Sequence, residues 1–153
     1  MNTVKDRTIL LVEDNPDDAD LTLLAFQEGS LTNEIVVARD GEEALHYLFG
    51  TGPYADQTTD LPAVILLDLK LPKIGGLDVL KQIRSDARTN CLPVVVLTSS
   101  KEEEDIMRSY SLGANAYVRK PVDYGEFVKA AQTLGLFWLL LNEAPPQRRS
   151  CAT

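Results

Sequence analysis

The chain has 153 residues, of which 44% are hydrophobic and 25% charged, a composition typical of one ordinary globular domain. The net charge of −8 argues against a nucleic-acid partner, because such binding depends on neutralising phosphates with Lys and Arg. No stretch approaches the roughly 18 apolar residues that a membrane span needs. The polar first seven residues lead directly into an expected strand and do not resemble a signal peptide, so we expect a cytoplasmic protein.

Apolar runs of strand length alternate with segments of helical period along the chain. Strands are expected at about 8–13, 34–38, 63–67, 93–98 and 116–119, and helices at about 16–29, 41–49, 75–86, 102–111 and 123–142. This alternation predicts an α/β fold with a parallel sheet covered by helices on both faces. We expect one domain over 1–143, with a long surface loop or insertion at 50–62, and a disordered tail at 144–153.

Helix-capping residues support these boundaries. Asn15 can cap the first helix, with Pro16 at its first position and acidic Asp17 and Asp18 in its first turn. Asp40 and Asp123 can cap the second and fifth helices in the same way.

Polar side chains stand at the ends of four expected strands. Glu13 and Asp14 end the first, Asp68 follows the third, Thr98 ends the fourth, and Lys120 follows the fifth. If the strands are parallel, these ends meet at one edge of the sheet. That edge would carry three carboxylates, a hydroxyl and an ammonium, which indicates a cation and phosphoryl site.

The carboxylates favour a magnesium ion. Placing two of them about 4 Å apart costs several kcal/mol at an effective dielectric near 20, and a divalent cation removes that cost. Oxygen ligands with room for water suit Mg²⁺. Glu13 and Asp14 alone are more typical of solvated loop acids, but Asp68 at a second strand end reverses that preference.

Asp68 is a metal ligand only, or also a nucleophile that holds a phosphoryl group as an acyl phosphate. In the second case Mg²⁺ and Lys120 would supply positive charge, and Thr98 would donate a hydrogen bond to a phosphoryl oxygen. Tyr117, three residues before Lys120, is either a packing residue or a side chain that swings inward with Thr98. Both alternatives remain open for Asp68 and for Tyr117.

Six short motifs carry a resemblance to a known family. They are Leu11-Val12-Glu13-Asp14-Asn15, Leu66-Leu67-Asp68-Leu69-Lys70-Leu71-Pro72, Gly75-Gly76, Leu97-Thr98-Ser99-Ser100, Gly113-Ala114 and Tyr117-Val118-Arg119-Lys120-Pro121. Together they resemble the receiver domain of two-component response regulators, the CheY-like family, over Arg7 to about Leu141. The resemblance implies a doubly wound, five-stranded parallel sheet in the order 2-1-3-4-5, a flavodoxin-like three-layer sandwich with its site at the carboxyl ends of the strands.

The resemblance also implies roles for the strand-end residues. Asp68 would take a phosphoryl group from a phosphohistidine on a sensor kinase. The ligands of Mg²⁺ would be the carboxylates of Glu13, Asp14 and Asp68 and the backbone carbonyl of Lys70. Thr98 and Tyr117 would form the switch pair, and Lys120 would be the lysine of the family motif.

Within the family, the chain is similar to the small stand-alone regulators of bacterial and cyanobacterial phytochromes, through the long loop 50–62, residues 121–124 and the ending 134–143. A phytochrome-type kinase is therefore the expected partner. Lys70 departs from the Asn or small polar residue that many relatives carry there. We predict that its long side chain slows autodephosphorylation by covering the acyl phosphate or hindering water.

The last helix is expected to deliver the output, since no DNA-binding unit is recognisable after it. Its core stripe would be Phe127, Ala131, Leu134, Trp138 and Leu141. A second apolar patch, Leu136, Leu139 and Leu140, falls on the opposite side of the helix. This patch is covered by the tail or a loop, or it forms a homodimer through the last helix and strand; we favour the dimer.

Three other classes of protein compete with the receiver domain. A metal-dependent phosphatase of the haloacid dehalogenase type also uses a strand-end Asp, a Thr, a Lys and Mg²⁺, but it needs an acid where Lys70 stands. A flavodoxin-like flavin binder would carry Ser/Thr/Gly-rich phosphate loops in place of the carboxylates. A phosphorylation-independent interaction module would not need so complete a site.

Overall fold

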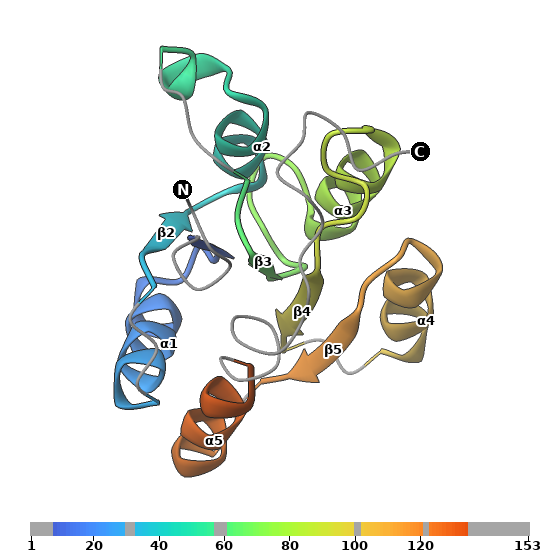
Figure 1. Cartoon of the computed structure of the whole chain (residues 1–153). Coiled ribbons are helices and arrows are strands. Elements are labelled where there is room, and N and C mark those ends of the chain that lie inside the picture. The colour runs from blue at the N-terminus through green and yellow to red at the C-terminus, as the bar shows by residue number, and fades with distance from the viewer. Residues whose placement is uncertain (1–7, 30–32, 57–60, 100–101, 121–122, 135–153) are drawn as a thin grey trace.

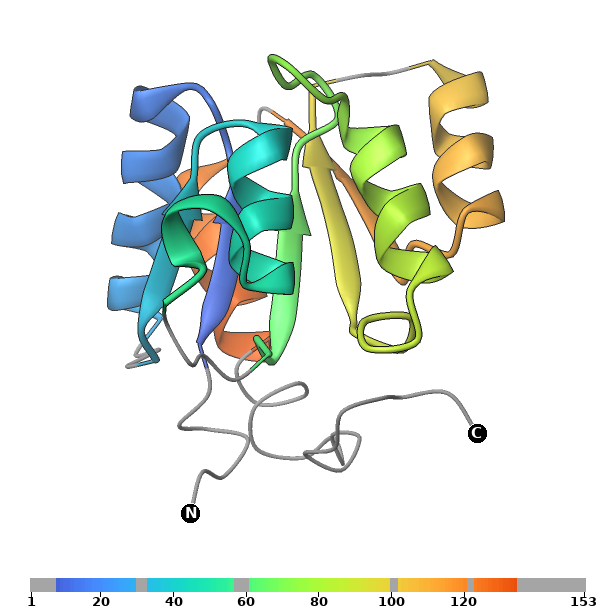
Figure 2. The same ribbon diagram turned by 90° about the horizontal axis from the view of Figure 1, so that it is seen from above.

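The computed structural model describes residues 8–29, 33–56, 61–99, 102–120 and 123–134. Their strands form one parallel sheet in the order β2-β1-β3-β4-β5, as the resemblance predicted. The strands are β1 (Ile9–Val12), β2 (Ile35–Ala38), β3 (Val64–Leu67), β4 (Val94–Thr98) and β5 (Ala116–Arg119). Because they run in the same direction, their carboxyl ends gather at one edge of the sheet, the upper edge in Figure 2.

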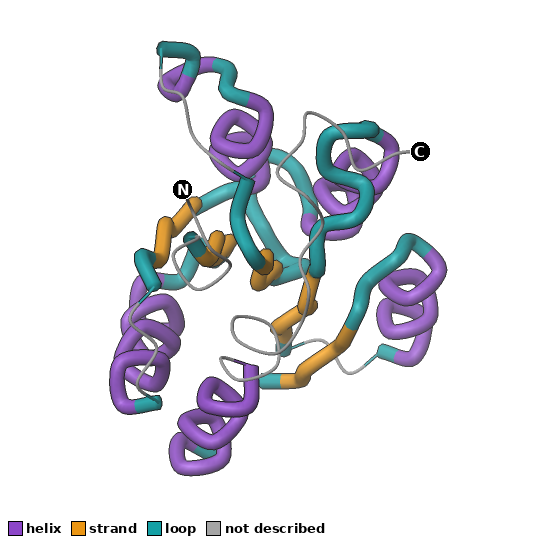
Figure 3. Tube along the Cα trace, in the orientation of Figure 1, coloured by secondary structure: helices purple, strands orange, loops and turns teal. Residues whose placement is uncertain are grey.

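Helices connect successive strands and cover both faces of the sheet. They are α1 (Pro16–Glu28), α2 (Gly41–Phe49), α3 (Gly76–Ser85), α4 (Glu103–Ser111) and α5 (Tyr124–Leu134), with a short 3₁₀ helix, η2 (Gly52–Tyr54), in the expected loop. α1 and α5 lie on one face, and α2, α3 and α4 lie on the other (Figures 1 and 3). The fold is therefore the predicted doubly wound three-layer sandwich. Within the described part of the chain, none of the helices is both long enough and apolar enough to cross a membrane.

The central strands are buried on both faces, which explains why they read as continuous apolar runs. Alternate residues of β1 and β3 enter different core clusters. Leu10, Val12, Ile65 and Leu67 pack with α2 and α3, while Ile9, Leu11, Val64 and Leu66 pack with α1. This packing holds the strand ends in fixed positions relative to one another.

Caps set the helix starts next to the strand ends. The Asn15 Oδ1 atom accepts hydrogen bonds from the backbone N–H groups of Asp17 (2.9 Å) and Asp18 (3.1 Å). Asp40 Oδ1 accepts one from the backbone N–H of Glu43 at 2.7 Å, and Asp123 Oδ2 accepts one from the backbone N–H of Glu126 at 3.1 Å, so all three predicted caps are confirmed. Because Asn15 follows Asp14 directly, the first turn of α1 begins beside the carboxyl end of β1.

Part of the expected last helix lies beyond the described residues. α5 is described to Leu134, whereas the sequence predicts a helix to residue 142. The apolar patch Leu136, Leu139 and Leu140 therefore lies outside the described residues, as do Trp138, Leu141 and the tail at 144–153.

Candidate functional site

Three carboxylates from two strand ends lie together at the upper edge of the sheet. One ligand atom each from Glu13, Asp14 and Asp68 lies within 4.8 Å of the others. Glu13 is 2% exposed and Asp68 7% exposed, whereas Asp14 is exposed to solvent. The backbone N–H of Asp68 donates to the carbonyl of Val12 at 3.1 Å, so β1 and β3 remain paired up to the point where these acids begin.

The ammonium of Lys120 lies among the carboxylates. Its Nζ atom is 2.7 Å from Glu13 Oε1, 3.0 Å from Asp18 Oδ2 and 3.2 Å from Asp68 Oδ2. The Lys120 side chain is only 14% exposed. The structure thus brings together four of the residues predicted from strand ends, with one cation facing several anions.

Backbone groups orient two of the carboxylates. Glu13 Oε2 accepts a hydrogen bond from the N–H of Asn15 at 3.2 Å, and Asp68 Oδ1 accepts one from the N–H of Lys70 at 3.1 Å. Oδ2 of Asp68 is the oxygen that faces Lys120. Gly76, at the start of α3, packs directly against the backbone of Asp68, and a Cβ on Gly76 would collide with the Asp68 carbonyl.

Burial and neighbouring charges shift two pKa values. Burial raises the pKa of Glu13 from 4.5 to about 7, and the charge of Asp68 adds to this, against the opposing hydrogen bond from Lys120. Burial also disfavours the charged form of Lys120, but hydrogen bonds to Glu13 and Asp18 outweigh it and raise the pKa of Lys120. Lys120 therefore stays cationic at neutral pH, while ionising Glu13 is costly when no other cation is near.

The donor set fits a hard divalent cation. All ligand atoms offered by the cluster are carboxylate oxygens, one acid is open to solvent, and the single ammonium offsets only part of the negative charge. The residues present therefore suit Mg²⁺ or a similar ion. The backbone carbonyl of Lys70, the fourth predicted ligand, belongs to the loop that follows Asp68.

The remaining predicted residues lie on β4 and β5. Thr98 is fully buried at the end of β4, and its carbonyl accepts a hydrogen bond from the N–H of Lys120 at 2.7 Å. Tyr117 pairs in register with Val96 and is half-buried against the core that contains α2 and α3. Thr98 and Lys120 therefore lie at the same edge of the sheet as the three carboxylates. Tyr117 lies inside β5, two residues before the end of that strand.

Asp18 is the site residue that the sequence analysis missed. The sequence alone indicates only an acidic residue in the first turn of α1, where a negative charge favours the helix dipole. In the structure its carboxylate bonds to Lys120. The sequence does contain a signal for this position. When a helix starts directly after a strand, its first turn lies beside the carboxyl end of that strand, and therefore beside the acidic edge of the sheet.

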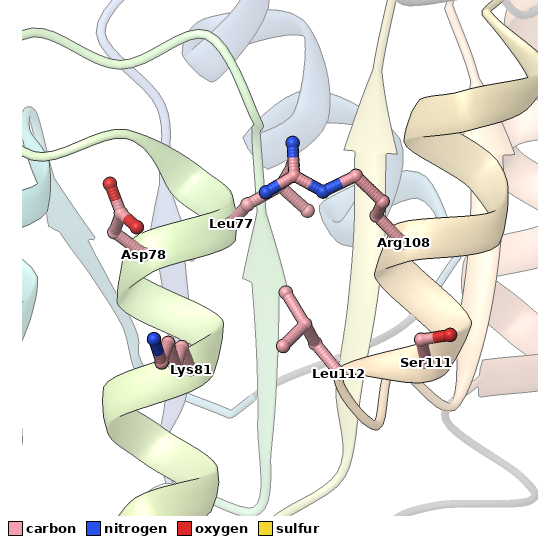
Figure 4. Close-up of a pocket in the computed structure, with 6 residues that line it drawn as sticks. All are labelled: Leu77, Asp78, Lys81, Arg108, Ser111 and Leu112. Carbon is pink, nitrogen blue, oxygen red and sulfur yellow. The ribbon is translucent and has the colours of Figure 1, made fainter.

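A shallow groove lies between α3 and α4 (Figure 4). Its volume is about 240 Å³, and it is lined by Leu77, Asp78, Lys81, Arg108, Ser111 and Leu112. None of the predicted site residues lines it. The candidate chemistry therefore belongs to the acidic edge of the sheet.

The family model for the response regulator receiver domain matches residues 9–132. The chain belongs to this family. Receiver domains are phosphoacceptor signalling domains that take a phosphoryl group from sensor histidine kinases. The match favours this class over the phosphatase and flavodoxin alternatives.

The similar proteins include regulators associated with phytochromes. Response regulator Rcp1 of Synechocystis sp. is 37% identical over 133 residues, which cover 87% of this chain and 89% of Rcp1. The structure of the phosphorylated cyanobacterial phytochrome response regulator RcpA is 40% identical with a TM-score of 0.81, covering 91% of this chain and 98% of RcpA. The structure of the bacteriophytochrome response regulator AtBRR is 58% identical with a TM-score of 0.74, and the match covers 90% of this chain and 98% of AtBRR. These matches confirm the predicted likeness to phytochrome response regulators.

Proposed function

We propose that this receiver domain accepts a phosphoryl group on Asp68 from a phosphohistidine of a phytochrome-type sensor kinase, in a Mg²⁺-dependent reaction. The observation that carries the proposal is the position of the Lys120 ammonium, 3.2 Å from Asp68 Oδ2, beside the Glu13–Asp14 corner. A nucleophilic carboxylate, a fixed cation and a set of hard oxygen ligands are the groups that phosphoryl transfer to an aspartate needs.

The proposed step forms one bond and breaks one. A carboxylate oxygen of Asp68 bonds to phosphorus as the P–N bond of the phosphohistidine breaks, and the imidazole nitrogen keeps that electron pair. Lys120 donates to the phosphoryl oxygens and stabilises the charge that develops on them. The N–H of Lys70 holds Asp68 Oδ1, which limits rotation of the carboxylate.

We propose Glu13, Asp14, Asp68 and the backbone carbonyl of Lys70 as the ligands of Mg²⁺. When bound, the ion supplies positive charge next to the transferred phosphoryl oxygens. The acidic cluster supports this proposal, and the solved Mn²⁺-bound form of Rcp1 is a relative that binds a divalent metal.

Thr98 and Tyr117 are the proposed switch pair. Thr98 would donate to a phosphoryl oxygen, and Tyr117 would move toward the space that Thr98 leaves. The support is that Thr98 shares the edge with Lys120, while Tyr117 is only half-buried two positions before the end of β5.

The decisive experiment is incubation with acetyl phosphate and Mg²⁺, followed by intact mass measurement. One added phosphoryl group that is lost in Asp68→Asn and in EDTA supports the proposal. Steady release of phosphate with many turnovers would instead support a phosphatase. An unmodified wild-type protein would favour the phosphorylation-independent interaction module.

The kinase class has a separate test. The likeness to Rcp1, RcpA and AtBRR supports a phytochrome-type donor. A panel of autophosphorylated histidine kinases should transfer phosphate fastest to this chain from a phytochrome kinase. Faster transfer from an unrelated sensor kinase would contradict this part of the proposal.

The proposed output is a homodimer through the last helix and strand, strengthened by phosphorylation. Its support is the apolar patch Leu136, Leu139 and Leu140 in the sequence. Sedimentation of the wild type and of the Leu136→Glu, Leu140→Glu variant, with and without phosphodonor, tests it. A wild-type monomer in both states would contradict it.

A further inference from the structure

We infer that Asp18 is a positioning residue that holds the Lys120 ammonium in line with the Asp68 carboxylate. Its effect on phosphorylation rests on the function proposed above, but its effect on Lys120 does not. Asp18 lies on α1, on a different element from either residue, and its Oδ2 atom is 3.0 Å from Lys120 Nζ.

The hydrogen bonds of the ammonium show what Asp18 does. A lysine ammonium has three N–H donors, and here three different carboxylates accept from it. Glu13 and Asp18 make the two shorter contacts, at 2.7 and 3.0 Å, and Asp68 makes the longest, at 3.2 Å. Two fixed contacts determine where the third N–H points, and it points at Asp68 Oδ2.

Glu13 and Asp18 differ in burial, so they contact the ammonium from different sides. The side chain of Glu13 is 3% exposed and approaches from the interior, whereas that of Asp18 is 42% exposed and approaches from the solvent side. Without Asp18, the ammonium would have no carboxylate on its solvent side among these three partners. A lysine has a flexible four-carbon stem, so a one-sided anchor leaves it considerable rotational freedom.

The helix holds Asp18 itself in place. Its N–H donates to the capping oxygen of Asn15 at 3.1 Å, and its carbonyl accepts from the hydroxyl of Thr22 at 2.9 Å. The carboxylate therefore projects from an anchored first turn.

Phosphorylation would use the longest of the three contacts, the one to Asp68 Oδ2. A phosphoryl group on Asp68 can take over the N–H that now faces Asp68 Oδ2, and the bonds to Glu13 and Asp18 can remain. Lys120 would then meet the transferred group without first losing its anchors, and such preorganisation lowers the barrier to charge development. Asp18 acts through Lys120 and touches none of the reacting atoms.

The first experiment reads the ammonium directly in the unphosphorylated protein. Lysine N–H signals in ¹H–¹⁵N spectra at neutral pH persist only for hydrogen-bonded, slowly exchanging ammonium groups, and Lys120→Met assigns the Lys120 signal. We expect this signal in the wild type and in Asp17→Ala, and its loss in Asp18→Ala. Asp17 is the matched control, since it is an exposed acid in the same helical turn. An unchanged Lys120 signal in Asp18→Ala, with its backbone spectrum intact, overturns the inference.

The second experiment measures the rate of phosphorylation by acetyl phosphate in Mg²⁺. Asp18→Ala should react about fivefold more slowly, as expected for losing a partly exposed hydrogen bond to a charged group. Asp18→Asn should recover part of the rate because its amide oxygen still accepts, and Asp17→Ala should match the wild type. Equal rates for Asp18→Ala and Asp17→Ala overturn the inference. A wild type that takes no phosphate would instead count against the proposed function, and the ammonium signal would still decide the role of Asp18.

Discussion

Oε1 of Glu13 lies 2.7 Å from Nζ of Lys120, although the two residues are 107 positions apart in the chain. This contact joins the end of β1 to the end of β5 across β3 and β4. It places a cation against a buried acid, and it explains why the edge of the sheet tolerates several carboxylates before any metal ion is bound. The carboxylates still outnumber the ammonium, so repulsion among them should lower the stability of the metal-free protein by a measurable amount.

Removing one acid should stabilise the metal-free protein. In Asp14→Asn, the repulsion among three carboxylates within 4.8 Å is reduced. We expect its melting midpoint in EDTA to rise by roughly 3 °C, the shift that about 1 kcal/mol produces in a domain of this size. Excess Mg²⁺ should raise the midpoint of the wild type and have much less effect on Asp14→Asn.

The matched control for this prediction is Asp17→Asn. It removes the same charge from an exposed position at the start of α1, outside the cluster. Its midpoint should stay level or fall slightly, because an acid in the first turn favours the helix dipole. A rise equal to that of Asp14→Asn would show that net charge alone, and not the cluster, sets the effect.

Glu13 should make the stability of the metal-free protein depend on pH. Its pKa is about 7 when folded against 4.5 as the reference, so between these values the folded state binds more proton than the unfolded state. Its contribution to the free energy of unfolding therefore falls as pH rises through this window and is constant outside it. The penalty above the window is on the order of 3–4 kcal/mol, from about 1.4 kcal/mol per pKa unit.

Glu13→Gln isolates this contribution, because the neutral amide has no such titration. In urea unfolding in EDTA, the free energy of unfolding of the variant should increase relative to that of the wild type as the pH rises from about 5 to 8. A difference between the two proteins that stays flat over this range would contradict the burial of an unfavourable charge at Glu13.

Gly76 should be far less replaceable than its neighbour Gly75. A Cβ on Gly76 would collide with the backbone carbonyl of Asp68, whereas a Cβ on Gly75 meets nothing within 4 Å. Both residues have a backbone that other residues can adopt, so the difference is one of space. We expect Gly76→Ala to lose about 1–3 kcal/mol of stability through overpacking and to phosphorylate more slowly. Gly75→Ala should remain near the wild type in urea unfolding and in rate.

Much of the fold followed from the sequence, for physical reasons. Strand-length apolar runs separated by helical segments leave few arrangements besides a parallel sheet with both faces covered. Parallel strands then require that Glu13, Asp68, Thr98 and Lys120 share an edge. The caps at Asn15 and Asp40 were predictable because their side chains act on backbone groups only two or three residues away.

The finer geometry depends on packing that no local pattern encodes. Glu13 and Asp14 are neighbours after the same strand, yet one is buried and the other exposed, because the turn into α1 determines their directions. The role of Asp18 depends on how α1 is rotated against the sheet. That rotation is set by buried residues such as Ala19 and Phe26, which are distant in sequence from Lys120.

Lys70 should lengthen the lifetime of the phosphorylated form. Its side chain is exposed two residues after Asp68, and its own N–H binds Asp68 Oδ1, so the stem starts beside the acyl phosphate. In Lys70→Asn, a shorter neutral side chain leaves water freer access, and the loss of phosphate followed by intact mass should become several-fold faster. Lys73→Asn is the matched control, since Lys73 is in the same loop but its ammonium is held 3.6 Å from Asp40 and 3.7 Å from Glu42. Asn also tolerates the positive φ of 67° at that position. An equal lifetime in Lys70→Asn and the wild type would show that the long cation does not shield the phosphoryl group.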